Sequence, residues 1–154
     1  MKRIRTRSAA ALLAAQAAFA TAALAQYDTT PDATMIRHPD VSRDKIVFGY
    51  ANDLWTVDRA GGVATPLSSP AGSESFARFS PDGSRVAFSG NYEGGTDVYI
   101  VPTNGGPAER LTYHPTGERV LDFTDAGILF VSDAQVPNSR QDHLWVVSPD
   151  GGMP

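Results

Sequence analysis

Short runs of alternating apolar and polar residues, rich in aromatic and β-branched side chains, recur along the chain and predict strands rather than helices. Each unit has a strand with a phenylalanine, a loop, and a second strand with a tryptophan or tyrosine that ends shortly before a Gly pair. We therefore predict an all-β fold made of repeats. The strand pairs are KIVFGY at 45–50 with DLWTV at 53–57, RVAFSG at 85–90 with DVYIV at 97–101, and ILFVSD at 128–133 with HLWVV at 143–147.

The Gly pairs at the ends of these units set the length of the repeat. They stand at residues 61–62, 105–106 and 151–152, which gives periods of 44 and 46 residues. A period of this length made of short strands is typical of a β-propeller blade. Shorter segments before and after each strand pair supply an inner and an outer strand, so each blade would be a four-stranded antiparallel sheet. We predict a partial β-propeller with blades at about 35–69, 75–113 and 119–154, the third incomplete.

The turn sequences indicate where the chain reverses. In SPDG at 80–83, proline presets φ for the second turn position, aspartate can bond its own backbone, and glycine accepts a positive φ. The NG pair at 104–105 suits the hairpin between the third and fourth strands. No phosphate-binding glycine pattern follows a strand, so we interpret these residues as structural.

The amino terminus differs in composition from the repeats. The basic stretch MKRIRTRS precedes an Ala-rich apolar run that ends in ALA at 23–25, a pattern after which signal peptidase cuts. We predict a signal peptide at 1–25 and a mature chain at 26–154, exported to the periplasm or the cell exterior. The alternative is a helix that stays in the membrane, but the run is weakly apolar and shorter than the ~20 residues that a span needs. The absence of cysteine fits an exported protein that does not rely on disulfides.

Charge limits the partners of the mature chain. Without the four basic residues of the predicted signal peptide, nine basic residues face 17 acidic ones, a net charge of −8. An acidic surface repels phosphate backbones, so we expect no nucleic-acid partner.

The chemistry of a hydrolase is absent from the sequence patterns. The chain has no Gly-x-Ser-x-Gly elbow and no cysteine, and His38, His114 and His143 follow no metal-ligand spacing. We interpret His38 and His114 as loop residues and His143 as a strand-entry residue. We expect no catalytic residue, no metal and no cofactor in these 154 residues.

Loop length indicates a candidate binding face. From the aromatic residue of the second strand to that of the third, the spacing grows from 7 to 11 to 15 residues along the chain. These loops emerge on the same face as the loops between blades, and insertions of this kind often mark a binding face. We predict a channel mouth there that steers a charged peptide terminus; the alternative is that its charges are only solvated or paired with each other. The candidate peptide-binding residues are Glu74, Arg78, Glu118 and Arg119.

Three aromatic residues stand at equivalent places in the repeats: Trp55, Tyr99 and Trp145. We interpret them as packing between blades. An exposed row that stacks on carbohydrate is the alternative, but packing of rings inside a β fold is commoner.

Several sequence phrases resemble the first propeller of tricorn-type serine peptidases, and together they extend over nearly everything from residue 35 to 154. The phrase FSPDG also occurs in TolB-like and dipeptidyl-peptidase-type propellers. The phrases are IRHPDVS at 36–42, ESFARFSPDG at 74–83, FSGNYEG at 88–94, TDVY at 96–99 and RLTYHP at 110–115.

The resemblance implies a large exported serine peptidase in which propellers precede a PDZ-like module and a carboxyl-terminal-processing catalytic domain. In such proteins the propeller is thought to admit and sort peptides. No catalytic residue of the family carries over, because the matching positions would lie beyond Pro154. The third repeat departs from the pattern, since FTDAG at 123–127 replaces the Ser-Pro-Asp-Gly form.

Three blades cannot close a ring, because a propeller typically has about 4–8. We therefore expect an amino-terminal piece of a longer protein, whose partners are peptides or unfolded protein segments, the remainder of the propeller and a downstream peptidase domain. The leading hypothesis is a non-catalytic substrate gate. A TolB-like periplasmic protein-binding propeller without enzymatic activity is the competing hypothesis, and a ring completed by a second copy of the chain is the third.

Overall fold

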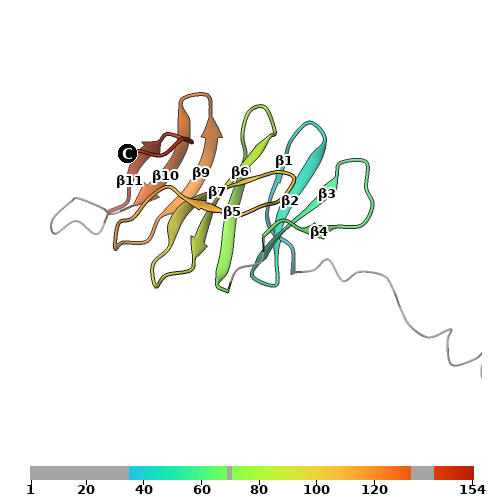
Figure 1. The fold of residues 1–154 in the computed structure, drawn as a ribbon, viewed down its shortest axis with the longest axis horizontal. Coiled ribbons are helices and arrows are strands. Elements are labelled where there is room, and N and C mark those ends of the chain that lie inside the picture. Colours follow the sequence, from blue (N-terminus) through green and yellow to red (C-terminus); the bar gives the residue numbers. More distant parts are fainter. Residues whose placement is uncertain (1–34, 69–70, 133–140) are drawn as a thin grey trace, which may run out of the picture. The chain divides into compact units, whose positions relative to one another are not determined.

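The repeats form three antiparallel sheets in the computed structural model, which describes residues 35–68, 71–132 and 141–154 (Figure 1). The predicted all-β fold of partial propeller blades is confirmed, with four, four and three strands per sheet. The first sheet holds β1 (Arg37–Val41), β2 (Lys45–Tyr50), β3 (Asp53–Asp58) and β4 (Thr65–Pro66). The second holds β5 (Ser73–Phe79), β6 (Arg85–Asn91), β7 (Asp97–Pro102) and β8 (Glu109–Arg110). The third holds β9 (Arg119–Thr124), β10 (Gly127–Ser132) and β11 (His143–Val147).

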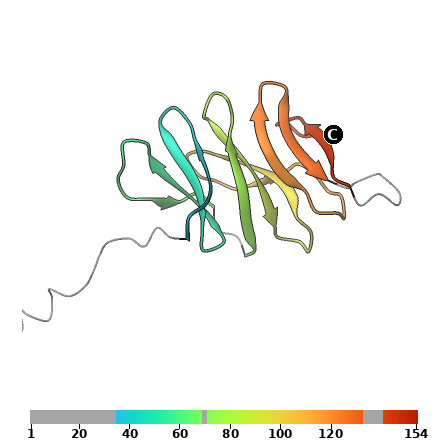
Figure 2. The ribbon, with the colours of Figure 1, turned by 180° about the vertical axis from the view of Figure 1, so that it is seen from behind.

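The strands of each sheet follow one another in space as they do in sequence, which is the meander of a propeller blade (Figure 1 and Figure 2). We call the three sheets blades 1, 2 and 3. Inner strand β1 contacts β5, and β5 contacts β9, so the blades lie side by side along their inner strands. The predicted signal peptide at 1–25 lies outside the described residues. Among the residues that the structure describes, no helix is long and apolar enough to cross a membrane.

The SPDG turn at residues 80–83 closes the hairpin between β5 and β6. Gly83 has a φ of 73° and donates its N–H to the Ser80 carbonyl at 2.8 Å. The hydroxyls of Ser80 and Ser84 both donate to the Asp82 carboxylate, and these hydrogen bonds lower the pKa of Asp82 to about 2. The residues of the turn therefore act as structural elements, as predicted from the sequence.

Apolar side chains fill the space between neighbouring blades. Tyr99 is 5% exposed in the first interface and Trp145 packs against the second, so these two aromatic residues pack between blades as predicted. Trp55, the third residue of that prediction, belongs to neither interface and instead contacts Tyr50 of its own blade. The first interface is built from Val47, Leu54, Leu67, Ala77, Phe79, Val86, Phe88, Tyr99 and Val101. The second is built from Ala87, Val98, Ile100, Leu111, Val120, Phe123, Ile128, Phe130 and Val147.

One sheet face of blade 3 differs from its counterparts in the other blades. Strand pairing makes Leu144 the equivalent of Leu54 and Val98, which are both completely buried by the next blade. Leu144 is 67% exposed, and its neighbour Val146 on the same face of β11 is also exposed. The apolar pattern of β11 is therefore that of a covered strand, although no described residue covers it.

Candidate functional site: the inner-strand mouth

The inner strands of blades 1 and 2 share a bulge that turns two rings toward each other. The pairing of β1 with β2 shifts between Arg37 and Asp40, and that of β5 with β6 shifts between Ser75 and Arg78. Inside these bulges His38 and Phe76 have φ angles of 46° and 55°. A bulky residue rarely adopts this left-handed conformation, which is characteristic of functional or strained positions.

The two bulges place side chains of three blades in one row. The rings of His38 and Phe76 lie 4.1 Å apart between centroids, tilted by 34°. On β9, the guanidinium carbon of Arg119 lies 5.6 Å from the centroid of the Phe76 ring, within the range of a cation–π contact. Blades 1, 2 and 3 each contribute one member of the row.

Two further arginines extend this row into a basic cluster. Arg78 donates from Nε to the Leu121 carbonyl at 2.8 Å and from Nη1 to the Ala77 carbonyl at 2.7 Å. Burial, followed by the charges of Arg78 and Arg37, lowers the pKa of His38. The histidine is therefore held neutral at pH 7. We define the inner-strand mouth as Arg37, His38, Phe76, Arg78 and Arg119.

No carboxylate neutralises the arginines of the inner-strand mouth. Within the described ranges, none of the three forms an ion pair, whereas Arg43, Arg85 and Arg110 each do. Among the acidic side chains near them in sequence, Asp40 and Asp122 accept the backbone N–H groups of Phe79 and Phe123 at 2.8 Å, and Glu118 accepts the hydroxyl of Thr112. The mouth is thus a local concentration of unpaired positive charge in an acidic chain.

A pocket of about 250 Å³ adjoins the inner-strand mouth. Arg37 and His38 line one side of it, and the start of β5 lines another with Ser73 and Ser75. The short loop between β2 and β3 contributes Asn52. This is the loop face that the sequence predicts as the binding face.

Glu74, one of the predicted site residues, lies inside the first interface rather than in an exposed loop. It belongs to β5 and is 5% exposed. Its Oε2 accepts the N–H of Leu54 at 2.8 Å and the hydroxyl of Ser68, and its Oε1 accepts the hydroxyl of Tyr92. The carboxylate therefore links blade 2 to the end of blade 1.

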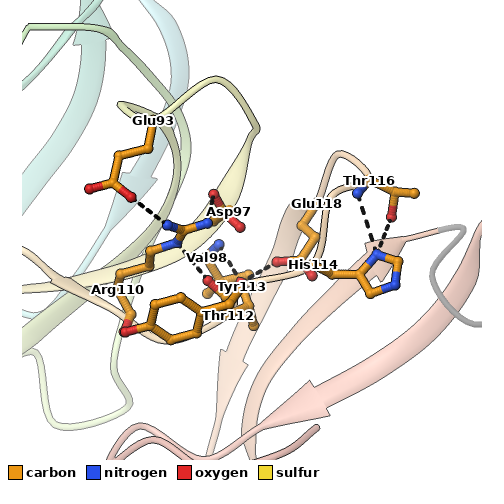
Figure 3. A network of polar contacts seen from close by, with 9 residues as sticks. All are labelled: Glu93, Asp97, Val98, Arg110, Thr112, Tyr113, His114, Thr116 and Glu118. Atoms are coloured by element: carbon orange, nitrogen blue, oxygen red, sulfur yellow. Dashed lines mark hydrogen bonds and ion pairs between the residues drawn. The ribbon is translucent and has the colours of Figure 1, made fainter.

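Glu118 repeats this arrangement in the second interface, where it is 3% exposed (Figure 3). It accepts the hydroxyl of Thr112, and the Oγ1 of Thr112 in turn accepts the N–H of Val98 at 2.9 Å. Each of these three residues stands 44 positions after its counterpart in the first interface. We call the two arrangements the carboxylate latches; Glu74, Ser68 and Leu54 form the first, and Glu118, Thr112 and Val98 form the second.

The second latch lies beside a buried ion pair. Asp97 is fully buried and receives Nη2 of Arg110 at 2.9 Å, while Nη1 of the same arginine binds Glu93 at 2.7 Å (Figure 3). Burial, with the negative charge of Asp97 as a smaller contribution, raises the pKa of Glu118. Both interfaces thus hold carboxylates that fix blade to blade.

The predicted site residues therefore separate into two groups. Arg78 and Arg119 belong to the inner-strand mouth, whereas the expectation that Glu74 and Glu118 are exposed mouth charges is wrong. Peptide binding by these four residues stays a prediction. The sequence reasoning missed Arg37 and also His38, which it placed in a loop although it lies in β1. Their only signal was the HPD phrase before β2, which places polar residues within an inner strand.

The sheets, their meander order and their 44-residue spacing define a segment of a β-propeller. The chain belongs to the family of the tricorn protease N-terminal β-propeller domain, whose model matches residues 33–154. It is 33% identical to the tricorn protease of Thermoplasma acidophilum over 128 residues, which cover 76% of this chain and 12% of the relative. It is also 33% identical to tricorn protease homolog 1 of Streptomyces coelicolor, over 76% of this chain and 11% of that protein.

Solved structures show the same relationship. The crystal structure of the tricorn protease matches with a TM-score of 0.65 and 28% identity, over 76% of this chain and 12% of that one. A TolB-like protein of Agrobacterium tumefaciens matches with a TM-score of 0.62 and 25% identity, over 71% of this chain and 43% of that one. The chain thus spans only about an eighth of the length of the tricorn proteases that it matches.

Proposed function

We propose that this chain is a non-catalytic propeller segment of an exported tricorn-like serine peptidase and that it admits peptides to a catalytic domain elsewhere in the full-length protein. The observation that carries the proposal is the family match over residues 33–154. Its partners in this role are the remainder of the propeller, the downstream peptidase domain and extended peptides.

The inner-strand mouth supports a role in handling peptides. Its side chains come from the strands that line the central channel of a propeller. Arg37 and Arg119 stand at the strand ends on the face where the loops between the second and third strands lengthen along the chain. The strained backbone of His38 and Phe76 supports the same role, because strain of this kind concentrates at binding sites.

Blocking the mouth tests the gating role. The 154 residues contain no cysteine, so Arg119→Cys in the full-length protein, with any cysteines elsewhere replaced, carries one thiol for a bulky maleimide. We expect the label to slow hydrolysis of a long unstructured peptide while sparing a small chromogenic amide. Arg59→Cys is the matched control, because Arg59 is exposed and follows β3 at the opposite end of its blade. Equal turnover of both substrates by the two labelled variants would contradict gating.

Export is the second part of the proposal. The basic start and Ala-rich run at 1–25 support it. Amino-terminal sequencing of the protein purified from its natural host should give a chain that begins at Gln26. A chain that keeps residues 1–25 would contradict cleavage.

The structural similarity to the TolB-like protein favours a second candidate function, a protein-binding propeller of the periplasm with no enzymatic activity. A fluorophosphonate probe distinguishes the two candidates, because it labels an activated serine. Labelling of the full-length protein supports the peptidase, and absence of labelling together with absence of peptide hydrolysis supports the binding module.

A further inference from the structure

We propose that a pocket in the second interface binds a tyrosine side chain of a peptide segment, whose phenol hydroxyl donates to Glu118. The pocket has a volume of about 220 Å³, and the rings of Phe130 and Trp145 line it together with the buried Glu118. It shares no residue with the inner-strand mouth. The inference goes beyond the proposed gating by the mouth and does not depend on it.

The first argument is the internal repeat, because the first interface holds a tyrosine in the equivalent place. There the ring of Tyr92 lies against Phe88 and Tyr99, with centroid distances of 6.4 and 4.7 Å. Its hydroxyl donates to Oε1 of Glu74. The partners of Tyr92 recur in the lining of the pocket. Strand pairing and the 44-residue period relate Phe88 to Phe130, Tyr99 to Trp145, Glu74 to Glu118 and Ser68 to Thr112.

The second argument is that the described residues supply no such ring to the second interface. Tyr92 follows β6 directly, but the sequence between β10 and β11, DAQVPNSRQD at 133–142, contains no aromatic residue. Tyr113 lines the pocket, but other contacts hold its ring (Figure 3). The guanidinium carbon of Arg110 lies 4.6 Å from the centroid of that ring, and the Tyr113 hydroxyl donates to the Arg110 carbonyl. A ring for this pocket therefore has to come from another segment.

The third argument is the hydrogen bonding of the two glutamates. Oε1 of Glu74 accepts the Tyr92 hydroxyl, and its Oε2 has two further donors. Oε2 of Glu118 accepts the hydroxyl of Thr112, but no described hydroxyl donates to its Oε1. A buried carboxylate is costly unless hydrogen bonds compensate its charge, and burial raises the pKa of Glu118. A phenol hydroxyl would supply the donor that Tyr92 supplies in the first interface.

The fourth argument is the size of the pocket and the access to it. Sites for drug-sized molecules have about 300–1,000 Å³, so a pocket of about 220 Å³ suits a single ring. Tyr113 and Met153 line the pocket and are 72% and 97% exposed, so a side chain can enter it from the solvent. A tyrosine on an extended peptide meets these conditions, because its ring can fill the pocket while the peptide backbone stays outside.

Peptide binding to the full-length protein tests the inference, with any catalytic serine blocked by an irreversible inhibitor. Fluorescence anisotropy would compare two labelled, acetylated and amidated Gly/Ser peptides that differ in one residue, tyrosine or phenylalanine. The tyrosine peptide should bind about tenfold more tightly, as expected for one hydrogen bond to a charged group. In Glu118→Gln this ratio should fall to about threefold, because a charge-assisted hydrogen bond is roughly twice as strong as a neutral one.

Glu74→Gln is the matched control, because Tyr92 already fills the equivalent place in the first interface. It should leave the ratio between the two peptides unchanged. Equal binding of the two peptides, no binding of either, or an unchanged ratio in Glu118→Gln would overturn the inference. If free 4-methylphenol binds as tightly as the tyrosine peptide, the pocket is a site for small phenols and the peptide is not its occupant.

A second measurement locates the site without any variant. A peptide with 4-azidophenylalanine in place of the tyrosine should cross-link on illumination to Trp145 or Tyr113, which mass spectrometry of the digested protein would identify. Cross-links confined to the inner-strand mouth would contradict the proposed site.

Discussion

The two blade interfaces each bury a glutamate carboxylate, but different side chains surround it. The two glutamates stand 44 residues apart. Glu74 accepts the N–H of Leu54 directly, whereas the hydroxyl of Thr112 lies between Glu118 and the N–H of Val98. In the first interface, Tyr92 and Ser68 donate hydroxyl groups to Glu74. In the second, Arg110 compensates the charge of Asp97, which lies close enough to Glu118 to raise its pKa.

The position of Arg110 explains the difference. Strand pairing makes Pro66 its equivalent in blade 1, because Pro66 pairs with Trp55 and Arg110 pairs with Tyr99. Proline cannot compensate a buried aspartate. The comparison teaches that the latch glutamate is part of the repeat, whereas the polar groups around it differ between the two interfaces.

The largest expected effect comes from Arg110→Met in the second interface. The change leaves Asp97 completely buried without its cation, and removal of one partner of a buried pair costs about 3 kcal/mol. Amide hydrogen exchange of residues 97–102 in the full-length protein should accelerate strongly. Arg85→Met is the control, because the ion pair of Arg85 with Asp150 is exposed and contributes little. Unchanged exchange in Arg110→Met would break the contrast between the interfaces.

Glu74→Gln should have the next largest effect, and a larger one than Glu118→Gln. An amide offers one acceptor oxygen in place of two, so a donor from Ser68, Leu54 or Tyr92 loses its acceptor at a cost of about 1–3 kcal/mol. Glu118→Gln removes a charge that burial and Asp97 disfavour, which offsets part of its loss. Hydrogen exchange of β3 and β7 in the two variants measures the difference. A larger loss in Glu118→Gln would contradict this ranking.

Tyr92→Phe sharpens the description of the first latch. It removes one hydroxyl donor while Leu54 and Ser68 still bind the carboxylate, so the expected cost is about 1 kcal/mol. Exchange should rise slightly in β3 and not at all in β7. Tyr113→Phe is the control, because its exposed hydroxyl donates only to the Arg110 carbonyl at 3.2 Å. An equal rise in both strands would mean that the two latches are coupled.

The pH dependence of the second latch should be the smallest effect. Because the folded pKa of Glu118 is raised above its ordinary value of 4.5, the folded state binds its proton more tightly than the unfolded state. The resulting stabilisation is complete below the unfolded pKa and is lost as the pH rises through the raised folded pKa. Relative to Glu118→Gln, the protein should therefore lose local stability from pH 4 upward. Hydrogen exchange of β7, corrected for its intrinsic pH dependence, measures this change; a gain in stability would show that the carboxylate is stabilised instead.

The sequence predicts the strands well because their residues are β-branched, aromatic and bounded by turn residues. It places Glu74 in a loop at the channel mouth, and alternation along β5 would not correct this, because alternation holds only where the strand is regular. Counting in steps of two from buried Phe79 assigns Glu74 to the opposite face, but the bulge around Phe76 adds a residue and turns Glu74 back toward blade 1. Nothing in the residue types marks that bulge, since phenylalanine seldom adopts a φ of 55°.

The sequence predicts Arg78 and Arg119 of the inner-strand mouth but misses its ring pair for a related reason. His38 and Phe76 stand 38 positions apart, and their contact exists only because both strands bulge at the same point. Arg119 joins them from a third strand. Spacing along the chain reveals residues that share one element, but not residues brought together by three irregular ones.

The face of β11 that no described residue covers has a practical consequence for work with this protein. Where no other sheet covers Leu144 and Val146, these exposed apolar side chains favour association between protein molecules. Self-association should therefore increase with protein concentration. Leu144→Lys is a simple change that should raise solubility for biophysical study. The same lysine would weaken the packing of any further sheet against this face of β11.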